Sequence, residues 1–281
     1  MIIALFPRIR DCKAQEVARE VLSFLSHREV TVVVEDDTAP LFGAPPLSSV
    51  HPEEIQFLVI IGGDGTILHV AHRYAHLDAA ILGINLGQLG FMADVQASDI
   101  IPSLNALLDG AYTIQNRTTI EGVVSNDRGR ALFAINDCVL HRAPNPSLVE
   151  ISIFIDDLFL NTFEADGVIL STPNGSTAYS LAAGGPIISP EVDALLLTPI
   201  CPHTISNRPI IISSHRTICI KYVSEKAPIR LVADGLQHFE IAHGDFVQIK
   251  KSSNPFKLVH LQSVNYFSTL RGKLRWTGKL R

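Results

Sequence analysis

The first 112 residues alternate short apolar runs with segments in which apolar residues recur every three or four positions. The strand-like runs cover residues 1–6, 30–35, 57–61 and 79–85. The segments with helical spacing cover residues 12–28, 67–75 and 98–110. Strands that alternate with helices predict parallel β-α-β units and therefore a doubly wound sheet.

After about residue 113 the pattern changes to short β-rich runs separated by Gly, Pro, Asn and Asp. Only the segment STAYSLAAGG, residues 176–185, has a helical character there. Regularly spaced strands with turn residues between them are typical of a β-sandwich or a barrel-like domain. We therefore expect an α/β domain over residues 1–112 and a β-rich, substrate-binding and oligomerising domain over 113–254, with the tail at about 255–281 as a candidate to pack back on the first.

Composition narrows the class of protein. The 281 residues are 47% hydrophobic and 18% charged, with 23 Lys and Arg against 28 Asp and Glu, which indicates a soluble globular chain. A net charge of −5 gives no electrostatic reason to expect a nucleic-acid partner. The four cysteines show no metal-ligand or disulfide spacing, and no run approaches the roughly 20 apolar residues that span a bilayer. The sequence thus favours a cytoplasmic protein without a membrane or nucleic-acid partner.

A glycine-rich turn joins the third strand-like run to a helix. In FLVIIGGDGTILHV, residues 57–70, the turn consists of Gly62, Gly63, Asp64, Gly65 and Thr66. Glycines let a backbone approach a phosphate closely, and the free N–H groups of a helix start attract negative charge. Beside phosphates, the carboxylate of Asp64 would either hold a divalent cation or accept the proton of an attacking hydroxyl. The alternative without function is an Asp-Gly turn in which Asp64 or Thr66 caps the helix.

A second motif, DGVILSTPNGSTAYSLAAGGPIISP, covers residues 166–190. Its small side chains allow a flat ring or a sugar to lie close to the backbone. The hydroxyls of Ser176, Thr177, Tyr179 and Ser180 could supply neutral donors and acceptors to such a ligand. The alternative is a tight corner whose hydroxyls only cap the backbone.

Together these motifs resemble the NAD kinase family. The segments that carry the resemblance are GGDGT, GINLGQLGFM, INDCVLHR, DGVILSTPNGSTAYSLAAGGPI, PHTISNRPIII and VADGLQ, in family order over roughly residues 57–245. The long Ser/Thr/Gly motif is the specific part, since GGDGT also occurs in diacylglycerol and sphingosine kinase relatives. The resemblance implies phosphoryl transfer from ATP, or from polyphosphate, to the 2′-hydroxyl of the adenosine ribose of NAD, giving NADP, with a divalent cation such as Mg²⁺. It also implies a homodimer or homotetramer.

The resemblance assigns roles to individual residues. Asp64 would be the proton acceptor, Gly65 would contact the same substrate, and His69 would lie near the phosphates. The remaining expected substrate or cofactor contacts are Gly63, Thr66, Asn136, Asp137, Glu164, Asp166, Thr177, Ala178, Tyr179, Ser180, Leu181, Ala182 and Gln237. The resemblance assigns no direct metal ligand, and ligation of the cation by Asp64 stays open as the alternative to proton transfer.

Two positions depart from the family pattern. Asp137 stands where the family usually has Glu, which keeps the charge but shortens the reach by one methylene. Leu236 stands where a glutamine is expected, and Gln237 follows one place later. On a strand, that shift would turn Gln237 to the opposite face, so its role stays open.

Two other functions share some of these features. A lipid or sphingoid-base kinase would share GGDGT but should carry an apolar acyl pocket. A non-catalytic NAD-binding protein would keep the dinucleotide contacts and tolerate the loss of Asp64.

Overall fold

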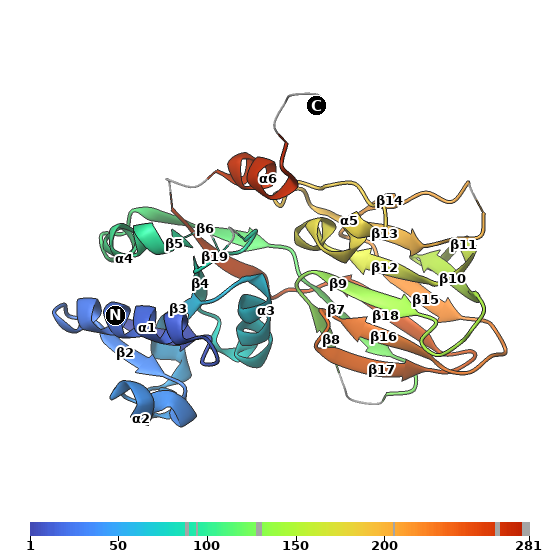
Figure 1. The fold of residues 1–281 in the computed structure, drawn as a ribbon. Coiled ribbons are helices and arrows are strands. Elements are labelled where there is room, and N and C mark those ends of the chain that lie inside the picture. Colours follow the sequence, from blue (N-terminus) through green and yellow to red (C-terminus); the bar gives the residue numbers. More distant parts are fainter. Residues whose placement is uncertain (88–89, 94, 128–130, 205, 262–264, 277–281) are drawn as a thin grey trace. The chain divides into compact units, whose positions relative to one another are not determined.

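A computed structural model describes residues 1–276 except 88–89, 94, 128–130, 205 and 262–264. The chain forms two compact units, shown in Figure 1. Unit 1 comprises Met1–Asn116 and Lys257–Arg281, and unit 2 comprises Arg117–Phe256. Each unit has a hydrophobic core of its own.

Unit 1 is built on a seven-stranded sheet in the order β2-β1-β3-β4-β19-β6, with β5 paired to β4. The strands are β1 (Ile2–Pro7), β2 (Thr31–Val34), β3 (Ile55–Ile61), β4 (Ala80–Asn85), β5 (Val95–Gln96), β6 (Tyr112–Arg117) and β19 (Phe256–Leu261). The pairs of β1 with β2 and β3, of β3 with β4, and of β4 with β5 and β19 are all parallel. This arrangement confirms the predicted parallel sheet. Strand β19 comes from the C-terminal part of the chain and lies between β4 and β6.

The helices of unit 1 cover both faces of this sheet. They are α1 (Cys12–Ser26), α2 (Ala39–Phe42), α3 (Asp64–Arg73), α4 (Ile100–Leu108) and α6 (Tyr266–Leu274). Helices α1 and α4 share one apolar cluster with alternate residues of β1, β3 and β4. Ile67 of α3 instead packs against Gly83, whose neighbours Leu82 and Ile84 belong to that cluster. Helix α3 therefore covers the opposite face, as in a doubly wound fold.

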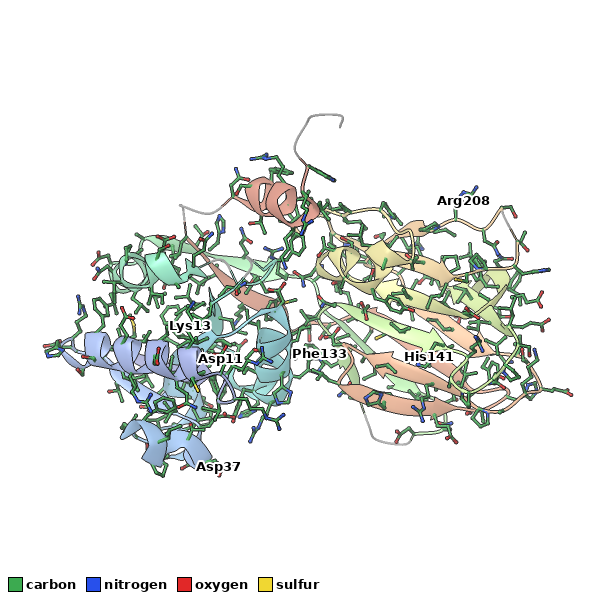
Figure 2. All side chains as sticks on the ribbon, in the orientation of Figure 1. Asp11, Lys13, Asp37, Phe133, His141 and Arg208 are labelled. Carbon is green, nitrogen blue, oxygen red and sulfur yellow. The ribbon has the colours of Figure 1, made fainter. Side chains whose placement is uncertain are left out.

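Helix α1 follows directly from its sequence pattern. Its side chains at spacings of three and four are buried: Ala14, Val17, Ala18, Val21 and Leu25. The carboxylate of Asp11 accepts the backbone N–H of Lys13 at 3.0 Å and caps the first turn (Figure 2).

The strand order places a topological switch point between β1 and β3. Strand β1 has β2 as its neighbour on one edge and β3 on its other edge, so the direction in which the chain adds strands reverses after β2. Doubly wound sheets bind ligands outside the carboxyl ends of the strands at such a point. Here the two carboxyl ends carry Arg8–Arg10 after β1 and the glycine turn after β3.

Unit 2 consists of two antiparallel six-stranded sheets that share one apolar core, which confirms the predicted β-sandwich. One sheet has the order β11-β10-β15-β18-β7-β8, and the other has the order β14-β13-β12-β9-β16-β17. The strands of the first are β7 (Ile120–Val124), β8 (Leu132–Ala134), β10 (Val149–Ile155), β11 (Leu158–Ala165), β15 (Ile218–Tyr222) and β18 (Phe246–Lys251). Those of the second are β9 (Asp137–His141), β12 (Gly167–Ser171), β13 (Ala194–Ile200), β14 (Ile210–Ser213), β16 (Ile229–Ala233) and β17 (Gln237–Ile241).

The helical segment expected at residues 176–185 is shorter than its pattern indicates. A 3₁₀ turn covers Asn174–Thr177, and α5 covers only Tyr179–Ala182. The two are separated by Ala178, whose φ of −97° and ψ of −127° interrupt the helical geometry. No helix within the described parts of the chain is long and apolar enough to cross a membrane.

Candidate active site

The glycine turn of unit 1 places Asp64 at the first position of α3, directly after Gly63. Its carboxylate accepts two backbone hydrogen bonds, from Phe91 N to Oδ2 at 2.9 Å and from Met92 N to Oδ1 at 3.1 Å. A carboxylate has about four lone-pair positions, so these bonds orient the group and leave acceptor capacity for a ligand. Asp64 thus does more than cap its own helix.

Gly90 makes this arrangement possible. A Cβ atom at that position would lie 2.0 Å from Oδ1 of Asp64, well inside van der Waals contact. The absence of a side chain at residue 90 therefore lets the segment reach the carboxylate closely enough for the next two amides to donate. This segment is part of the motif GINLGQLGFM, of which residues 88 and 89 lie outside the described residues.

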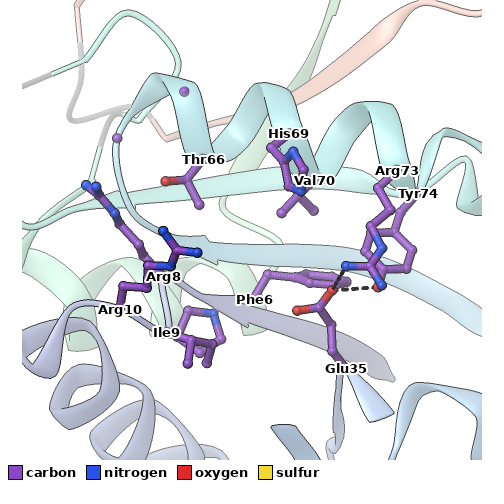
Figure 3. A pocket seen from close by; sticks show the side chains of 13 residues that line it. Phe6, Arg8, Ile9, Arg10, Glu35, Thr66, His69, Val70, Arg73 and Tyr74 are labelled. Carbon is purple, nitrogen blue, oxygen red and sulfur yellow. Dashed lines mark hydrogen bonds and ion pairs between the residues drawn. The ribbon is translucent and has the colours of Figure 1, made fainter. Parts of the chain in front are cut away.

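A cavity of about 660 Å³ lies at the switch point of unit 1 (Figure 3). That volume is in the usual range for small-molecule sites. The cavity brings together four of the residues expected from the sequence, namely Gly63, Gly65, Thr66 and His69. It follows α3 from the first turn to Tyr74, and its other wall is the end of β1 and the residues after it.

Two arginines in this cavity were not identified from the sequence. Arg8 and Arg10 follow β1 directly, and Figure 3 shows both on the side of the cavity where α3 begins. Within the described part of the chain, neither side chain has a hydrogen bond or an ion pair. The signal was present, since PRIR follows the first strand and a central parallel strand ends at the ligand-binding edge.

The opposite end of the cavity carries a fixed carboxylate. Oε1 of Glu35 accepts hydrogen bonds from Arg73 at 3.0 Å and from the hydroxyl of Tyr74 at 2.7 Å (Figure 3). Burial, followed by the hydrogen bond to Glu35, raises the pKa of Tyr74 well above its ordinary value. The Tyr74 hydroxyl therefore remains a hydrogen-bond donor to Glu35 at any pH near neutrality.

In unit 2 a partly buried network organises the segment Asn136–Asp137. The carboxylate of Asp234 accepts the backbone N–H groups of Ile135, Asn136 and Asp137 at 2.7, 2.9 and 2.9 Å. Asp234 has a φ of 50°, in the left-handed region, which turns the chain ahead of Gly235. The sequence motif VADGLQ contained this residue, but nothing in its pattern indicated that Asp234 would hold the predicted Asn-Asp pair.

The side chain of Asn136 is also fixed. Its Oδ1 accepts a hydrogen bond from Asn174 at 2.6 Å, which ties it to the long Ser/Thr/Gly motif. Gly175 lies so close that a Cβ there would be 2.1 Å from the carbonyl oxygen of Asn136. Two motifs far apart in sequence therefore form one rigid corner of unit 2.

Asp137 lies in the same corner and is 6% exposed. Burial, and to a smaller degree the charge of Asp234, raises the pKa of Asp137 to about 7. Near neutral pH the Asp137 carboxyl is therefore divided between an anionic form that accepts hydrogen bonds and a neutral form that can also donate one.

The hydroxyls of the long motif divide into two groups. Ser176 is fully buried and accepts the N–H of Ile188 at 2.9 Å, and Ser180 is fully buried and bonds to Thr198 at 2.8 Å. The structure thus places the Ser180 hydroxyl against Thr198 inside the fold, and a contact between Ser180 and substrate stays a prediction from the sequence. The other predicted residues of this stretch are partly or fully exposed and remain candidates for ligand contact: Thr177, Ala178, Tyr179, Leu181 and Ala182.

The other predicted residues of unit 2 have partners within the chain. Asp166 forms an ion pair with Arg142 at 2.6 Å, and the exposed Glu164 lies 3.6 Å from His203. Gln237 accepts the backbone N–H of Phe133 at 3.0 Å, while Leu236 is 38% exposed. Gln237 thus joins two strands through its side-chain oxygen.

The described side chains form no set of ligands that could hold a metal ion without further ligands. Among the residues that the structure describes, no group of three or more His, Cys, Asp or Glu side chains is placed to hold one. A divalent cation at this site would therefore need other ligands, such as phosphate oxygens and water.

Comparison with known families identifies both halves of the chain. Residues 3–112 match the ATP-NAD kinase N-terminal domain, and residues 135–261 match the ATP-NAD kinase C-terminal domain. An NAD kinase of Protochlamydia amoebophila is 46% identical over 280 residues, covering 100% of both chains. An NAD kinase of Geotalea daltonii is 37% identical over 280 residues, covering 98% of both.

Two solved structures share the whole fold. A yeast NADH kinase complexed with NADH has a TM-score of 0.87 at 28% identity, covering 100% of this chain and 89% of that one. An NAD kinase from Archaeoglobus fulgidus in complex with ATP has a TM-score of 0.76 at 25% identity, covering 98% and 99%. The chain belongs to the ATP-NAD kinase family of phosphotransferases.

Proposed function

We propose that this protein transfers the terminal phosphoryl group of ATP to the 2′-hydroxyl of the adenosine ribose of NAD, with Asp64 as the proton acceptor. Family membership supports the reaction class, and similarity to proteins named NAD kinase over the full chain supports the acceptor. The two relatives solved with NADH and with ATP support the two substrates.

The observation that carries the role of Asp64 is its geometry at the start of α3. A secondary hydroxyl is a weak nucleophile, and phosphoryl transfer depends mainly on positioning and charge neutralisation. The amides of Phe91 and Met92 hold the carboxylate in one orientation while acceptor positions stay available. A carboxylate fixed in this way can orient the ribose hydroxyl and take its proton as the phosphorus–oxygen bond forms.

The donor phosphates would occupy the cavity beside the glycine turn. Gly63 and Gly65 expose backbone there at the N-terminus of α3, where the helix dipole favours anions. Arg8 and Arg10 add two positive charges that no internal partner neutralises within the described residues. His69 lies one turn further along the same helix.

Unit 2 would contribute the dinucleotide contacts. The corner held by Asp234 presents Asn136 and Asp137, and the exposed residues from Thr177 to Ala182 lie on the same long motif. The buried hydroxyls of Ser176 and Ser180 keep that motif rigid, which reduces the entropy lost when a ligand binds.

The expected divalent cation would bind together with the phosphoryl donor, ATP. Because the described residues offer no three-ligand set, the cation would arrive on the phosphate oxygens and neutralise their charge. Mg²⁺, which keeps several waters and prefers phosphate oxygens, suits such a role.

Self-association is the expected quaternary arrangement. Leu158 and Phe159, at one end of β11, are 74% and 61% exposed. Apolar side chains presented to water in this way are consistent with a homodimer or homotetramer through unit 2. Light scattering of the purified protein measures the oligomer directly.

An assay of purified protein tests the function. NAD, ATP and Mg²⁺ are supplied, and NADP is detected with an NADP-specific dehydrogenase. Parallel reactions replace ATP by inorganic polyphosphate, and NAD by diacylglycerol or sphingosine. We expect NADP from NAD; phosphorylation of a lipid, or NAD binding without turnover, would overturn the proposal.

A further inference from the structure

The two ends of the unit 1 cavity differ in chemistry. One end has the start of α3 with Arg8 and Arg10, and the other has the carboxylate of Glu35. Gly65 and Tyr74 both line the cavity and are nine residues apart, which is about 13 Å along a helix. A triphosphate attached to a ribose can extend over a comparable distance, so a donor whose phosphates lie at the first end would bring its sugar toward the second.

Glu35 is held so that one of its oxygens faces no protein donor. Arg73 and Tyr74 both donate to Oε1. Within the described part of the chain no hydrogen bond reaches Oε2. The Glu35 side chain is 23% exposed and lines the cavity. A fixed carboxylate oxygen that lacks a donor is an acceptor site for a ligand.

A carboxylate that accepts hydrogen bonds can discriminate between ATP and polyphosphate as phosphoryl donors. The 2′- and 3′-hydroxyls of a ribose are neutral donors, and hydrogen bonds to a carboxylate are stronger than those between neutral groups. An ionised inorganic phosphate chain offers only acceptors. Glu35 therefore has a favourable interaction with a nucleoside triphosphate that it cannot have with polyphosphate.

The position in the fold agrees with this role. Glu35 follows β2 (Thr31–Val34), and β2 is the neighbour of β1 in the parallel sheet. In dinucleotide-binding sheets of related architecture, an acid that follows the second strand hydrogen-bonds ribose hydroxyls. We propose that Glu35 determines donor specificity by accepting hydrogen bonds from the ribose of ATP, which rests on the proposed function of this cavity as the donor site.

The test compares donors with and without the ribose hydroxyls. Initial rates are measured with ATP, 2′-deoxy-ATP and 3′-deoxy-ATP, and tripolyphosphate is used as an inhibitor competing with ATP. For Glu35→Ala we expect kcat/KM for ATP to fall roughly tenfold, equivalent to about 1.4 kcal/mol. The preference for ATP over at least one deoxy donor should disappear in that variant, and the inhibition constant of tripolyphosphate should change less than about twofold.

Matched variants distinguish a loss of ribose recognition from a general loss of folding or activity. Asp37→Ala removes an acid two residues away, which is labelled in Figure 2. Asp37 lines the neighbouring cavity of about 530 Å³ but not the donor cavity. It should behave as the unmodified protein does. Arg8→Ala should raise the inhibition constant of tripolyphosphate and the KM of ATP together, because it acts on the phosphates. Glu35→Gln keeps an oxygen for Arg73 and Tyr74, and it serves if Glu35→Ala fails to fold.

The outcomes are distinct. Glu35 does not recognise the ribose if the unmodified protein has equal kcat/KM values for ATP and both deoxy donors. The same conclusion follows if Glu35→Ala raises the inhibition constant of tripolyphosphate by the same factor by which it lowers kcat/KM for ATP. If the unmodified protein forms no NADP from ATP, the proposed function itself fails.

Discussion

The two units differ in how far the polar side chains of their candidate ligand-binding residues are hydrogen-bonded within the protein. In unit 1 the site lies at the open edge of a parallel sheet, where the arginines after β1 have no internal partner among the described residues and Asp64 retains acceptor capacity. In unit 2 the corresponding motif is closed on itself, with Ser176, Ser180 and Asn136 all hydrogen-bonded inside the fold. The comparison indicates that unit 1 presents reactive and charged groups, whereas unit 2 supplies a rigid surface. Substitutions in the two units should therefore affect activity and stability differently.

Apart from a change of Asp64 itself, the largest effect on activity should come from Gly90→Ala. The added Cβ would lie 2.0 Å from Oδ1 of Asp64 and would push the carboxylate or its loop out of place. Loss of a positioned general base reduces rates by about 10²–10⁴-fold, and we expect kcat to fall into that range. Gly87→Ala is the control, because among the described residues its Cβ would meet only Oδ1 of Asn85, at an ordinary 3.8 Å. Equal kcat values for the two variants would contradict the proposed dependence on Asp64.

In unit 2, Gly175→Ala should act mainly on stability. Its Cβ would lie 2.1 Å from the backbone oxygen of Asn136, which cannot move without disturbing the network around Asp234. We expect the free energy of unfolding to fall by about 2–3 kcal/mol, measured by denaturant titration. The Cβ of Gly272→Ala, in α6, would meet no atom of the described residues within 4 Å, and this change should not destabilise the protein. Full stability of Gly175→Ala would show that the corner is not rigid.

The buried Asp137 should make stability depend on pH. Its pKa rises from 3.8 in the unfolded chain to about 7 in the fold, so between these values the folded state binds more protons and stability falls as pH rises. From pH 5 to pH 8 the loss should be roughly 2–3 kcal/mol, and Asp137→Asn should remove it.

Thermal or denaturant unfolding at the two pH values measures this difference. Asp157→Asn changes an exposed acid of the same unit and should keep the pH dependence of the unmodified protein. An unchanged profile in Asp137→Asn would show that the carboxyl at residue 137 does not titrate in this range.

The smallest effect should come from Ser180→Ala. Removing this hydroxyl breaks its hydrogen bond to Thr198 in the core and should cost about 1–2 kcal/mol of stability. Because the side chain is fully buried, kcat/KM for NAD should stay within about twofold at temperatures where the variant is folded. A large loss of kcat/KM without a loss of stability would contradict this expectation and would support the substrate contact that the sequence predicts for Ser180.

Much of this architecture follows from local patterns. The alternation of strands and helices in the first half predicts a parallel sheet, and turn-punctuated β runs predict a sandwich; both are confirmed. Periodicity also identified the buried face of α1. It could not assign β19 to a sheet, because pairing with β4 depends on contacts between residues almost 180 positions apart.

The details of the site depend on similar long-range contacts. Nothing local distinguishes the buried hydroxyl of Ser180 from the more exposed one of Thr177. The amides that orient Asp64 come from residues 27 and 28 positions further along the chain. The role proposed for Glu35 can be inferred only by combining the strand order with the rule that ligands bind at a switch point.

The central claim is that the Asp64 carboxylate accepts the proton of the attacking hydroxyl, and Asp64→Asn tests it most directly. The control is Asp99→Asn, which changes an exposed acid at the start of α4 in the same unit. We expect Asp64→Asn to bind NAD with a nearly unchanged dissociation constant while kcat for NADP formation falls about 10²–10⁴-fold, with Asp99→Asn close to the unmodified protein. Turnover by Asp64→Asn equal to that of the unmodified protein would contradict the account.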